Sequence, residues 1–155
     1  MNLYKLIAAI TISQSAGLIG AAFTASSVST WYATLAKPAF TPPSWLFSPV
    51  WITLYTLMGI SAYLVWQKGL KKKKVKTALT IFGIQLLLNA LWSIIFFGLR
   101  NPLLAFLEIT LLLAAIAVTT VKFYSISRVS AMLLVPYILW VAFAAILNFG
   151  IVVMN

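Results

Sequence analysis

The sequence contains no cysteine, no histidine and no aspartate, and Glu108 is its single acidic residue. Without cysteine and histidine the chain has no disulfide, no thiolate nucleophile, no imidazole acid or base and no ordinary zinc site. A Ser-His-Asp triad is excluded as well. These absences remove most hydrolytic and metal-dependent enzyme classes, so we expect no metal site and no required cofactor.

Charge of either sign is scarce, because charged residues make up 8% of the chain and hydrophobic residues 63%. A soluble domain has about 25% charged residues, so most of this surface must contact lipid instead of water. The net charge of +10 does not indicate nucleic-acid binding. Five of the cations lie within residues 71–76, between two long apolar runs, where membrane proteins keep cytoplasmic charge.

Five apolar stretches are long enough to cross the bilayer core of roughly 30 Å, which takes about 20 helical residues. They are residues 3–25, 49–67, 77–99, 102–121 and 129–154. The sequence therefore predicts an all-α, polytopic membrane protein in which residues 1–155 form a single domain, a bundle of five transmembrane helices. The first stretch is interpreted as a retained helix, because it is longer than the core of a signal peptide and four more spans follow.

The connections between these spans carry recognisable start signals. Ser48-Pro49 and Asn101-Pro102 each place a capping residue before a proline at the first helical position. The longest connection, residues 26–48, is rich in aromatic residues and prolines, unlike the Gly/Ser composition of flexible linkers. We expect it to form a stiff lid that packs over one end of the bundle.

The cations predict the orientation in the membrane. Nine lysines and arginines flank one side of the predicted bundle, whereas only Lys37 and Arg100 flank the other. Because cytoplasmic loops carry the excess of positive charge, the N-terminus and the lysine-rich loop are expected in the cytoplasm. The lid and the C-terminus are then expected outside, in a protein of the cell membrane.

Aromatic and polar residues recur at helical spacing within three of the spans. The three faces consist of Trp51, Tyr55, Met58 and Ala62, of Gln85, Asn89, Trp92 and Phe96, and of Tyr137, Trp140, Ala144, Asn148 and Ile151. Polar side chains are costly in hydrocarbon unless they find a partner or a cavity, so these faces should point into the bundle. Either they supply interhelical hydrogen bonds and interfacial tryptophans, or they meet in a pocket for a planar apolar ligand.

Two further features have alternative interpretations. Glu108 lies about two turns inside its span, where an acid is a candidate for proton coupling. We favour a structural role for it, in which it pairs with Arg100 or bonds to a neighbouring helix. Ala16 with Gly20, and Gly17 with Ala21, form small-xxx-small pairs that allow close approach of helices, either within one chain or between two.

Three segments of the chain resemble one known family. The segment WYATLAKPAFTPPSWLFSPVWITLYTLMGISAYLVW, residues 31–66, is similar to the first loop and second helix of the TspO/MBR family. This family comprises the tryptophan-rich sensory proteins of bacteria and the translocator proteins, or peripheral benzodiazepine receptors, of mitochondria. The pattern continues in NALWSIIFFGLRNP, residues 89–102, and VPYILWVAFAAILN, residues 135–148, and the chain most resembles the bacterial members.

The resemblance implies a five-helix bundle, often a homodimer, with a ligand pocket beneath the first loop. The family binds porphyrins such as protoporphyrin IX, and its mitochondrial members also bind cholesterol and isoquinoline or benzodiazepine-type drugs. The mitochondrial sterol motif needs a basic residue that is missing after Phe149, so tight sterol recognition is not expected here. With Tyr55 and Tyr137 from the faces above, the expected ligand-binding residues are Tyr32, Pro42, Trp51, Tyr55, Asn89, Trp92, Tyr137, Trp140, Phe143, Ala144, Leu147 and Asn148.

Three functional hypotheses follow. In the first, the chain is a receptor in which a tetrapyrrole stacks on Trp51 and Trp140, with hydrogen bonds from Asn89 and Asn148 and its propionates near Lys37. Because no histidine or cysteine can ligate iron, metal-free porphyrin should be preferred over haem. In the second, the protein promotes light-dependent breakdown of protoporphyrin IX as a substrate, with the two indoles as oxidisable groups. The third is transport of tetrapyrroles or similar small hydrophobic molecules, although the first span lacks the acid that proton-coupled drug exporters use.

Overall fold

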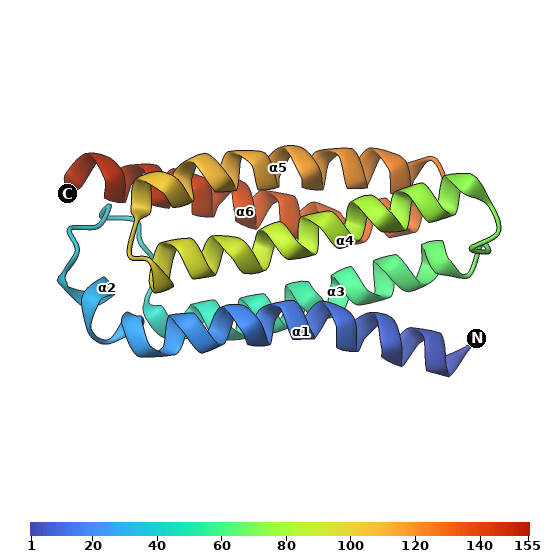
Figure 1. Cartoon of the computed structure of the whole chain (residues 1–155), viewed down its shortest axis with the longest axis horizontal. Helices are drawn as coiled ribbons and strands as arrows, with labels where there is room; N and C mark the ends of the chain where they lie inside the picture. The colour runs from blue at the N-terminus through green and yellow to red at the C-terminus, as the bar shows by residue number, and fades with distance from the viewer.

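The computed structural model describes all residues from 1 to 155, and it consists of helices and connections without a strand. Five long helices lie side by side: α1 (Leu3–Val28), α3 (Phe47–Trp66), α4 (Lys73–Ser93), α5 (Pro102–Tyr124) and α6 (Arg128–Met154) (Figure 1). All five are long and apolar enough to cross a membrane. The prediction of an all-α, five-helix polytopic membrane protein is therefore confirmed, with span limits that differ by only a few residues.

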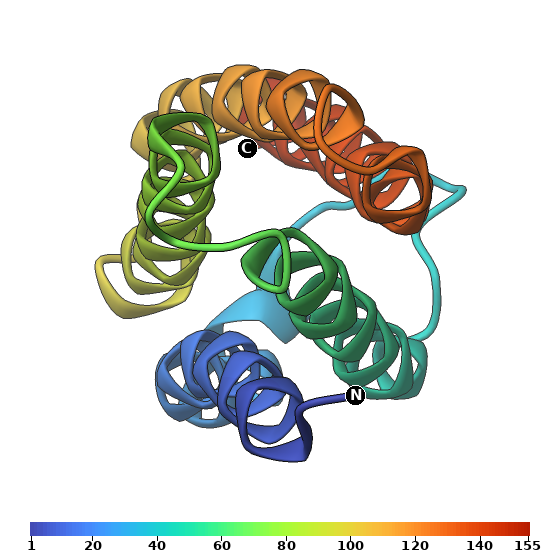
Figure 2. The same cartoon turned by 90° about the vertical axis from the view of Figure 1, so that its right-hand side faces the viewer.

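The five helices form a closed ring in cross-section. Following the contacts, the order around the ring is α1, α3, α6, α5, α4 and back to α1, and Figure 2 shows this arrangement from one end. Apolar side chains fill much of the interior of the ring, and Met58 and Phe123 are completely buried in it. This arrangement lets each helix bury one stripe against two neighbours while the opposite stripe faces lipid.

The start of α5 agrees with the predicted signal. Asn101 Oδ1 accepts a hydrogen bond from the backbone N–H of Leu104 at 3.0 Å, and Pro102 occupies the first turn. Arg100 has a φ of 52°, the left-handed conformation, which reverses the chain between α4 and α5. Before this turn, α4 continues as one turn of π-helix, η2 (Ile94–Gly98).

The prediction that Ser48 caps a helix starting at Pro49 is wrong. A turn of 3-10 helix, η1 (Ser44–Leu46), leads directly into α3, which begins at Phe47. Ser48 therefore lies inside the helix and forms no side-chain cap. Pro49 is still in the first turn, where the missing N–H of proline leaves no hydrogen bond unmade.

The connection between α1 and α3 crosses one end of the bundle, as the lid was expected to do (Figure 1). It is shorter than the predicted residues 26–48, because α1 continues to Val28 and η1 and α3 begin before Ser48. We define the lid as residues 29–46. It contains one short helix, α2 (Trp31–Thr34), and ends in η1.

The small residues of α1 allow close contacts within a single chain. A Cβ added to Gly20 would lie 2.9 Å from the side-chain oxygen of Ser93 in α4. Towards the other end of the bundle, a Cβ on Gly59 of α3 would lie 2.5 Å from the Cα of Ile10 in α1. The close approach predicted from the small-xxx-small pairs therefore positions α1 against α3 and α4 of its own chain.

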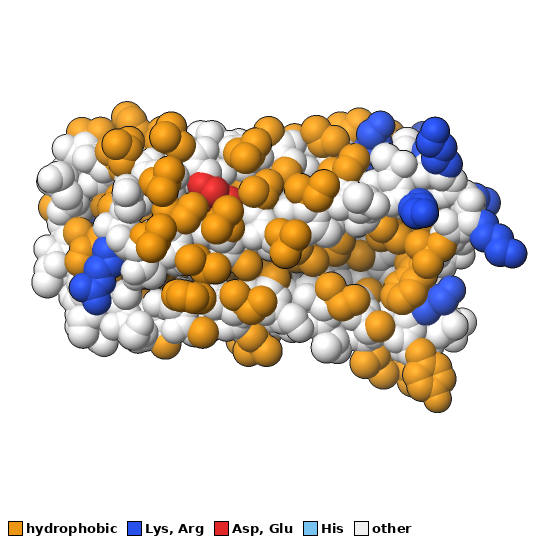
Figure 3. Space-filling view, viewed as in Figure 1, with side chains coloured by type: hydrophobic (Ala, Val, Ile, Leu, Met, Phe, Trp, Pro, Cys, Tyr) orange, Lys and Arg blue, Asp and Glu red, His pale blue; other side chains and the backbone are white.

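Charged and apolar side chains occupy different parts of the surface. Figure 3 shows lysine and arginine side chains gathered at the end opposite the lid, with apolar side chains along the length of the bundle. Large apolar side chains along the helices are strongly exposed, such as Leu87 at 73% and Val121 at 68%. Such exposure of apolar area is what contact with lipid acyl chains requires.

Candidate functional site

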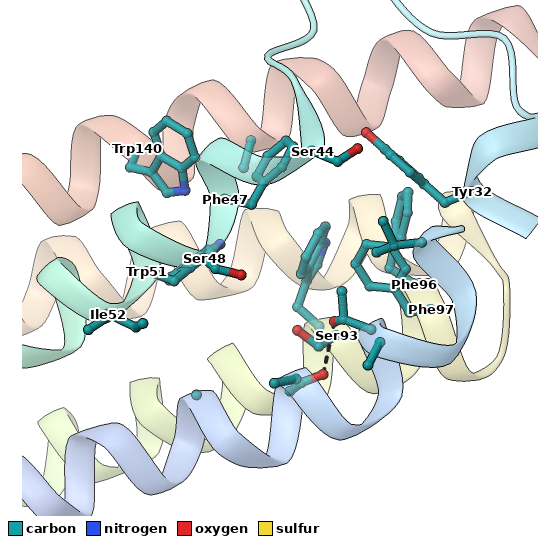
Figure 4. A pocket seen from close by; sticks show the side chains of 18 of the residues that line it. Tyr32, Ser44, Phe47, Ser48, Trp51, Ile52, Ser93, Phe96, Phe97 and Trp140 are labelled. Carbon is teal, nitrogen blue, oxygen red and sulfur yellow. Dashed lines mark hydrogen bonds between the residues drawn. The ribbon is translucent and has the colours of Figure 1, made fainter. Parts of the chain in front are cut away.

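A cavity of about 560 Å³ lies in the half of the bundle next to the lid, between α1, α3, α4, α6 and the lid itself (Figure 4). Small-molecule sites typically enclose about 300–1,000 Å³ and have mostly apolar and aromatic walls. The aromatic side chains that line this cavity are Tyr32, Phe47, Trp51, Tyr55, Trp92, Phe96, Phe97 and Trp140. Its size and walls therefore suit a flat, largely apolar organic molecule.

Most of the residues predicted as ligand-binding line this one cavity. Eight do so: Tyr32, Trp51, Tyr55, Trp92, Trp140, Ala144, Leu147 and Asn148. They come from the lid and from α3, α4 and α6. The three helical faces that were read from residue spacing thus converge, although contact with a ligand stays a prediction.

Asn89 and Tyr137 lie behind the cavity wall and do not line it. The hydroxyl of Tyr55 donates a hydrogen bond to Asn89 Oδ1, and Asn89 Nδ2 donates to the hydroxyl of Tyr137 at 2.8 Å. The Tyr137 hydroxyl in turn donates to Gln85 Oε1 at 2.7 Å. This buried network connects α3, α4 and α6, so these groups have the interhelical role that was the first of the two interpretations.

Pro42 and Phe143 also lie outside the cavity lining. The ring of Phe143 packs against Trp140 with a centroid separation of 5.6 Å, and against Phe40 of the lid at 6.3 Å. Phe143 therefore supports the cavity wall from behind and also contacts the lid. Pro42 belongs to the extended part of the lid between α2 and η1.

Both polar atoms of the Asn148 amide form hydrogen bonds within the chain. Its Oδ1 accepts a hydrogen bond from Trp92 Nε1 at 3.0 Å, and its Nδ2 donates to the carbonyl of Pro102 at 2.8 Å. The side chain thereby connects α4, α5 and α6 and fixes the plane of the Trp92 indole, which also stacks on Phe96 with centroids 5.1 Å apart. The main effect of Asn148 is therefore on the shape of the cavity, because both of its polar atoms already have partners within the chain.

Trp140 supplies the polar group that is left unpaired at the cavity. Its indole N–H is buried and has no hydrogen-bond partner within the chain. The ring packs edge-on against Phe47, with centroids 6.0 Å apart, and Figure 4 shows both side chains at the cavity. The nitrogen is closed off from the cavity as well as from solvent, so an acceptor on a bound molecule reaches it only after the surrounding side chains move.

Helix α1 forms a further wall of the cavity, one that the residue types of the first span do not predict. Its contribution consists mainly of small or short side chains: Gly17, Gly20, Ala21, Thr24 and Ala25. Below them, Gln14 Nε2 donates hydrogen bonds of 3.0 Å to the Ile52 carbonyl and to Thr56 Oγ1, and so joins α1 to α3. The small residues at spacings of three and four along α1 indicate helix packing, and they also leave space for a cavity.

Lys37 is bonded within the lid. Its ammonium donates to the carbonyls of Tyr32 at 2.8 Å and Leu35 at 3.0 Å, and it lies 4.7 Å from the centre of the Tyr32 ring. Burial raises the pKa of the Tyr32 phenol above its ordinary value, so the phenol is neutral at physiological pH. Lys37 thus stabilises the end of α2 and holds Tyr32 at the rim of the cavity.

Glu108 does not take part in the cavity and has none of the structural partners that we favoured. It is 8% exposed on the buried face of α5, and neither of its carboxylate oxygens has a hydrogen-bond partner within the chain. The predicted pairing with Arg100 is wrong, because Arg100 is exposed in the turn before α5, about two turns away. The predicted bond to a neighbouring helix is also absent.

The fold and the site define a class of protein: a polytopic α-helical membrane protein with a partly open aromatic cavity between its helices, beneath a lid. The sequence model of the TspO/MBR family matches residues 9–154. The chain therefore belongs to the TspO/MBR family, which confirms the resemblance seen in its motifs.

Individual relatives match along most of their length. The Tryptophan-rich protein TspO of Archaeoglobus fulgidus is 47% identical, over 100% of this chain and 99% of its own. The human Translocator protein is 41% identical, over 90% of this chain and 83% of its own. Protein CrtK of Rhodobacter capsulatus is 39% identical, over 88% of this chain and 83% of its own.

Proposed function

We propose that this protein binds flat, largely apolar tetrapyrroles such as protoporphyrin IX in the cavity beneath the lid. One observation carries the proposal: three tryptophans from three different helices, Trp51, Trp92 and Trp140, line a single cavity of about 560 Å³. Aromatic faces provide a large contact area for a planar ring and favour offset stacking or edge-to-face contact with it. Membership of the TspO/MBR family is consistent with such a ligand.

The unpaired N–H of Trp140 adds a polar requirement to this proposal. Leaving a buried donor without a partner costs about 1–3 kcal/mol, and a ligand carbonyl or carboxylate would recover it if ligand binding moves aside the side chains that cover the nitrogen. Porphyrin propionates offer such acceptors, and so do the ring nitrogen of isoquinolines and the carbonyl groups of benzodiazepine-type ligands. We therefore expect these drug-like molecules to compete with protoporphyrin IX for the same cavity.

The ligand should be metal-free. The chain contains no histidine or cysteine, so neither of the common axial iron ligands is available at the cavity. The cavity also has no aspartate or glutamate among its lining residues. We therefore expect protoporphyrin IX to bind more tightly than haem, which a parallel titration of the two would measure.

The direct test is a titration of protoporphyrin IX against the tryptophan fluorescence of the purified protein. Replacing Trp51 and Trp140 together by phenylalanine should weaken binding at least about tenfold, because ring contact and one hydrogen bond are lost. The matched control is Trp45→Phe, since Trp45 is 71% exposed and does not line the cavity. Equal affinity of the double variant and the wild type would refute the proposed site.

A second candidate function is light-dependent breakdown of the bound porphyrin, which the presence of Trp51 and Trp140 on the cavity wall favours. A light-excited porphyrin would transfer its energy to dissolved dioxygen, and the activated dioxygen would add across a ring double bond, leaving both oxygen atoms in the product. The protein would supply confinement, with the Trp51 and Trp140 indoles holding the ring in place. If illumination of the complex gives the same rate and products as porphyrin in detergent alone, this function is excluded.

The orientation and assembly are also proposals. The concentration of cations at the end opposite the lid supports a cytoplasmic N-terminus, with the lid and the C-terminus outside the cell membrane (Figure 3). The family resemblance supports a homodimer. Transport of tetrapyrroles or similar molecules stays a prediction, which flux measurements in proteoliposomes would test.

A further inference from the structure

The lid is fastened to the end of α6 by one side chain. Asn155 Oδ1 accepts a hydrogen bond from the backbone N–H of Ala36 at 3.0 Å, and Asn155 Nδ2 donates to the carbonyl of Ala36 at 2.9 Å. The same Nδ2 also donates to the carbonyl of Ile151 at 2.8 Å, inside α6. The amide is thus oriented by its own helix, and it binds both backbone groups of one lid residue.

Two apolar contacts continue this attachment along α6. Pro38 lies directly on Gly150, where even a single added Cβ would collide with the proline ring. Further along, Phe40 packs against Phe143, with ring centroids 6.3 Å apart. The segment from Ala36 to Phe40 therefore follows α6 from its C-terminal end inwards, and Gly150 allows the lid backbone to lie close to the helix.

The attached segment lies between two parts of the lid that line the cavity. Tyr32 lines the cavity before this segment, and Ser44 lines it after the segment. Tyr32 is itself held by Phe96 and Phe97, with ring centroids 6.2 Å and 5.7 Å away. Ala36, in the middle of the lid, has no aromatic ring to anchor it in this way. Its backbone is held by the two hydrogen bonds to Asn155.

We infer that Asn155 is a positioning residue for the ligand site: by binding Ala36 it keeps the lid over the cavity and sets the rate at which ligand exchanges past the lid. Both residues are exposed, so water competes for these hydrogen bonds and the attachment is of moderate strength. The lid should therefore open transiently in the wild type and more often without Asn155. The ligand part of this inference rests on the proposed function, whereas the attachment does not.

The attachment is tested first without any ligand, by backbone hydrogen exchange of residues 29–43 in detergent-solubilised protein. In Asn155→Ala the amide of Ala36 should exchange about tenfold faster, because two hydrogen bonds at one residue are lost. The control is Asn2→Ala, which removes another exposed asparagine, one that caps α1 at the opposite end through Lys5. Unchanged exchange at Ala36 in Asn155→Ala would overturn the inference.

The kinetic test uses stopped-flow mixing with protoporphyrin IX. Asn155→Ala should raise the association and dissociation rates together by about tenfold, leaving Kd nearly unchanged, since Asn155 does not line the cavity. Asn155→Asp should not rescue the effect, because its carboxylate would face the carbonyl oxygens of Ala36 and Ile151 at the negative end of the α6 dipole. Gly150→Ala should act in the same direction by displacing Pro38.

The two tests separate the possible failures. Faster exchange at Ala36 with unchanged porphyrin rates would overturn the positioning role, because the ligand would then enter by a route that avoids the lid. If the wild type binds no porphyrin, the proposed function and the ligand part fail together, while the exchange result still decides whether Asn155 holds the lid. Thermal unfolding of Asn155→Ala in detergent should match the wild type, since the exposed attachment is remote from the buried core.

Discussion

The ring of Tyr55 in α3 fills the space that a side chain at Gly17 in α1 would occupy: a Cβ at residue 17 would lie 2.5 Å from Tyr55 Cε2. Tyr55 cannot easily move aside, because its hydroxyl donates to Asn89 and its ring stacks on Trp51 with centroids 5.4 Å apart. The distance between α1 and α3 at the cavity therefore depends on the absence of a side chain at Gly17.

The first prediction concerns this contact. Gly17→Ala should lower the free energy of unfolding by about 1–3 kcal/mol, because the added methyl overpacks the interface against Tyr55. It should also weaken porphyrin binding, since both residues line the cavity. Gly83→Ala is the matched control: nothing lies within 4 Å of its added Cβ, and the better helix propensity of alanine should preserve or slightly raise stability. The measurement is the free energy of unfolding of both variants in detergent. Equal stability of Gly17→Ala and Gly83→Ala would contradict this prediction.

The second prediction separates the wall of the cavity from the network behind it. Tyr137→Phe removes a completely buried hydroxyl that bonds Asn89 and Gln85, so unfolding should become easier by about 1–3 kcal/mol. Porphyrin affinity should stay close to that of the wild type, because Tyr137 does not line the cavity. Trp140→Phe should do the reverse and reduce affinity with little loss of stability, since its N–H has no partner in the chain. A large loss of affinity in Tyr137→Phe would place that residue in the binding site after all.

The third prediction concerns Lys37. Lys37→Met removes two donated hydrogen bonds and the cation above the Tyr32 ring, so backbone amides of α2 should exchange faster with solvent. Because the ammonium is already bonded in the lid, the variant should distinguish protoporphyrin IX from its dimethyl ester as well as the wild type does. If the variant loses this discrimination, Lys37 binds the propionates, as the sequence analysis proposed.

The fourth prediction tests the orientation in the membrane. The chain has no cysteine, so single cysteines can be introduced without background labelling. In intact cells a membrane-impermeant maleimide should label Ala39→Cys in the lid, and it should label Lys72→Cys only after the membrane is permeabilised. Both positions are exposed, so access depends on the side of the membrane and not on burial. The opposite labelling pattern would reverse the proposed topology.

The limits of the helices were predictable where a single physical requirement determines them. The bilayer thickness demands about 20 apolar residues, so the five spans follow from hydrophobic length alone. Asn101 with Pro102 marked a helix start correctly because the turn before it is very short. Ser48 with Pro49 did not, because the preceding Ser44–Leu46 turn joins α3 and moves the true start upstream.

The site was predictable in part for a similar reason. The helical period places Trp51 with Tyr55, and Trp140 with Asn148, on inward faces, and the structure brings these residues to one cavity. Whether an inward amide faces the cavity or a neighbouring helix depends on which donors and acceptors lie nearby in three dimensions. Asn89 is therefore enclosed by two tyrosine hydroxyls, a placement that its sequence position does not reveal.

The contribution of α1 could not be read from residue chemistry. Gly17 and Gly20 offer no ring, charge or hydrogen-bonding side chain, and they act only by the space that they leave. The same applies to Gly150 beneath Pro38. Asn155 has a polar side chain, but its partner Ala36 is 119 residues away in the sequence, and no local pattern connects the two.

The central claim, that a flat ligand occupies the cavity beneath the lid, is tested most directly by filling the cavity. Ala144 lines it, whereas Ile146 on the same helix is 58% exposed towards lipid and does not. Protoporphyrin IX should be titrated against the wild type, Ala144→Phe and the control Ile146→Phe, with folding checked by thermal unfolding in detergent. The account predicts saturable one-to-one binding in the wild type and the control and its loss in folded Ala144→Phe; equal affinity in all three would contradict it.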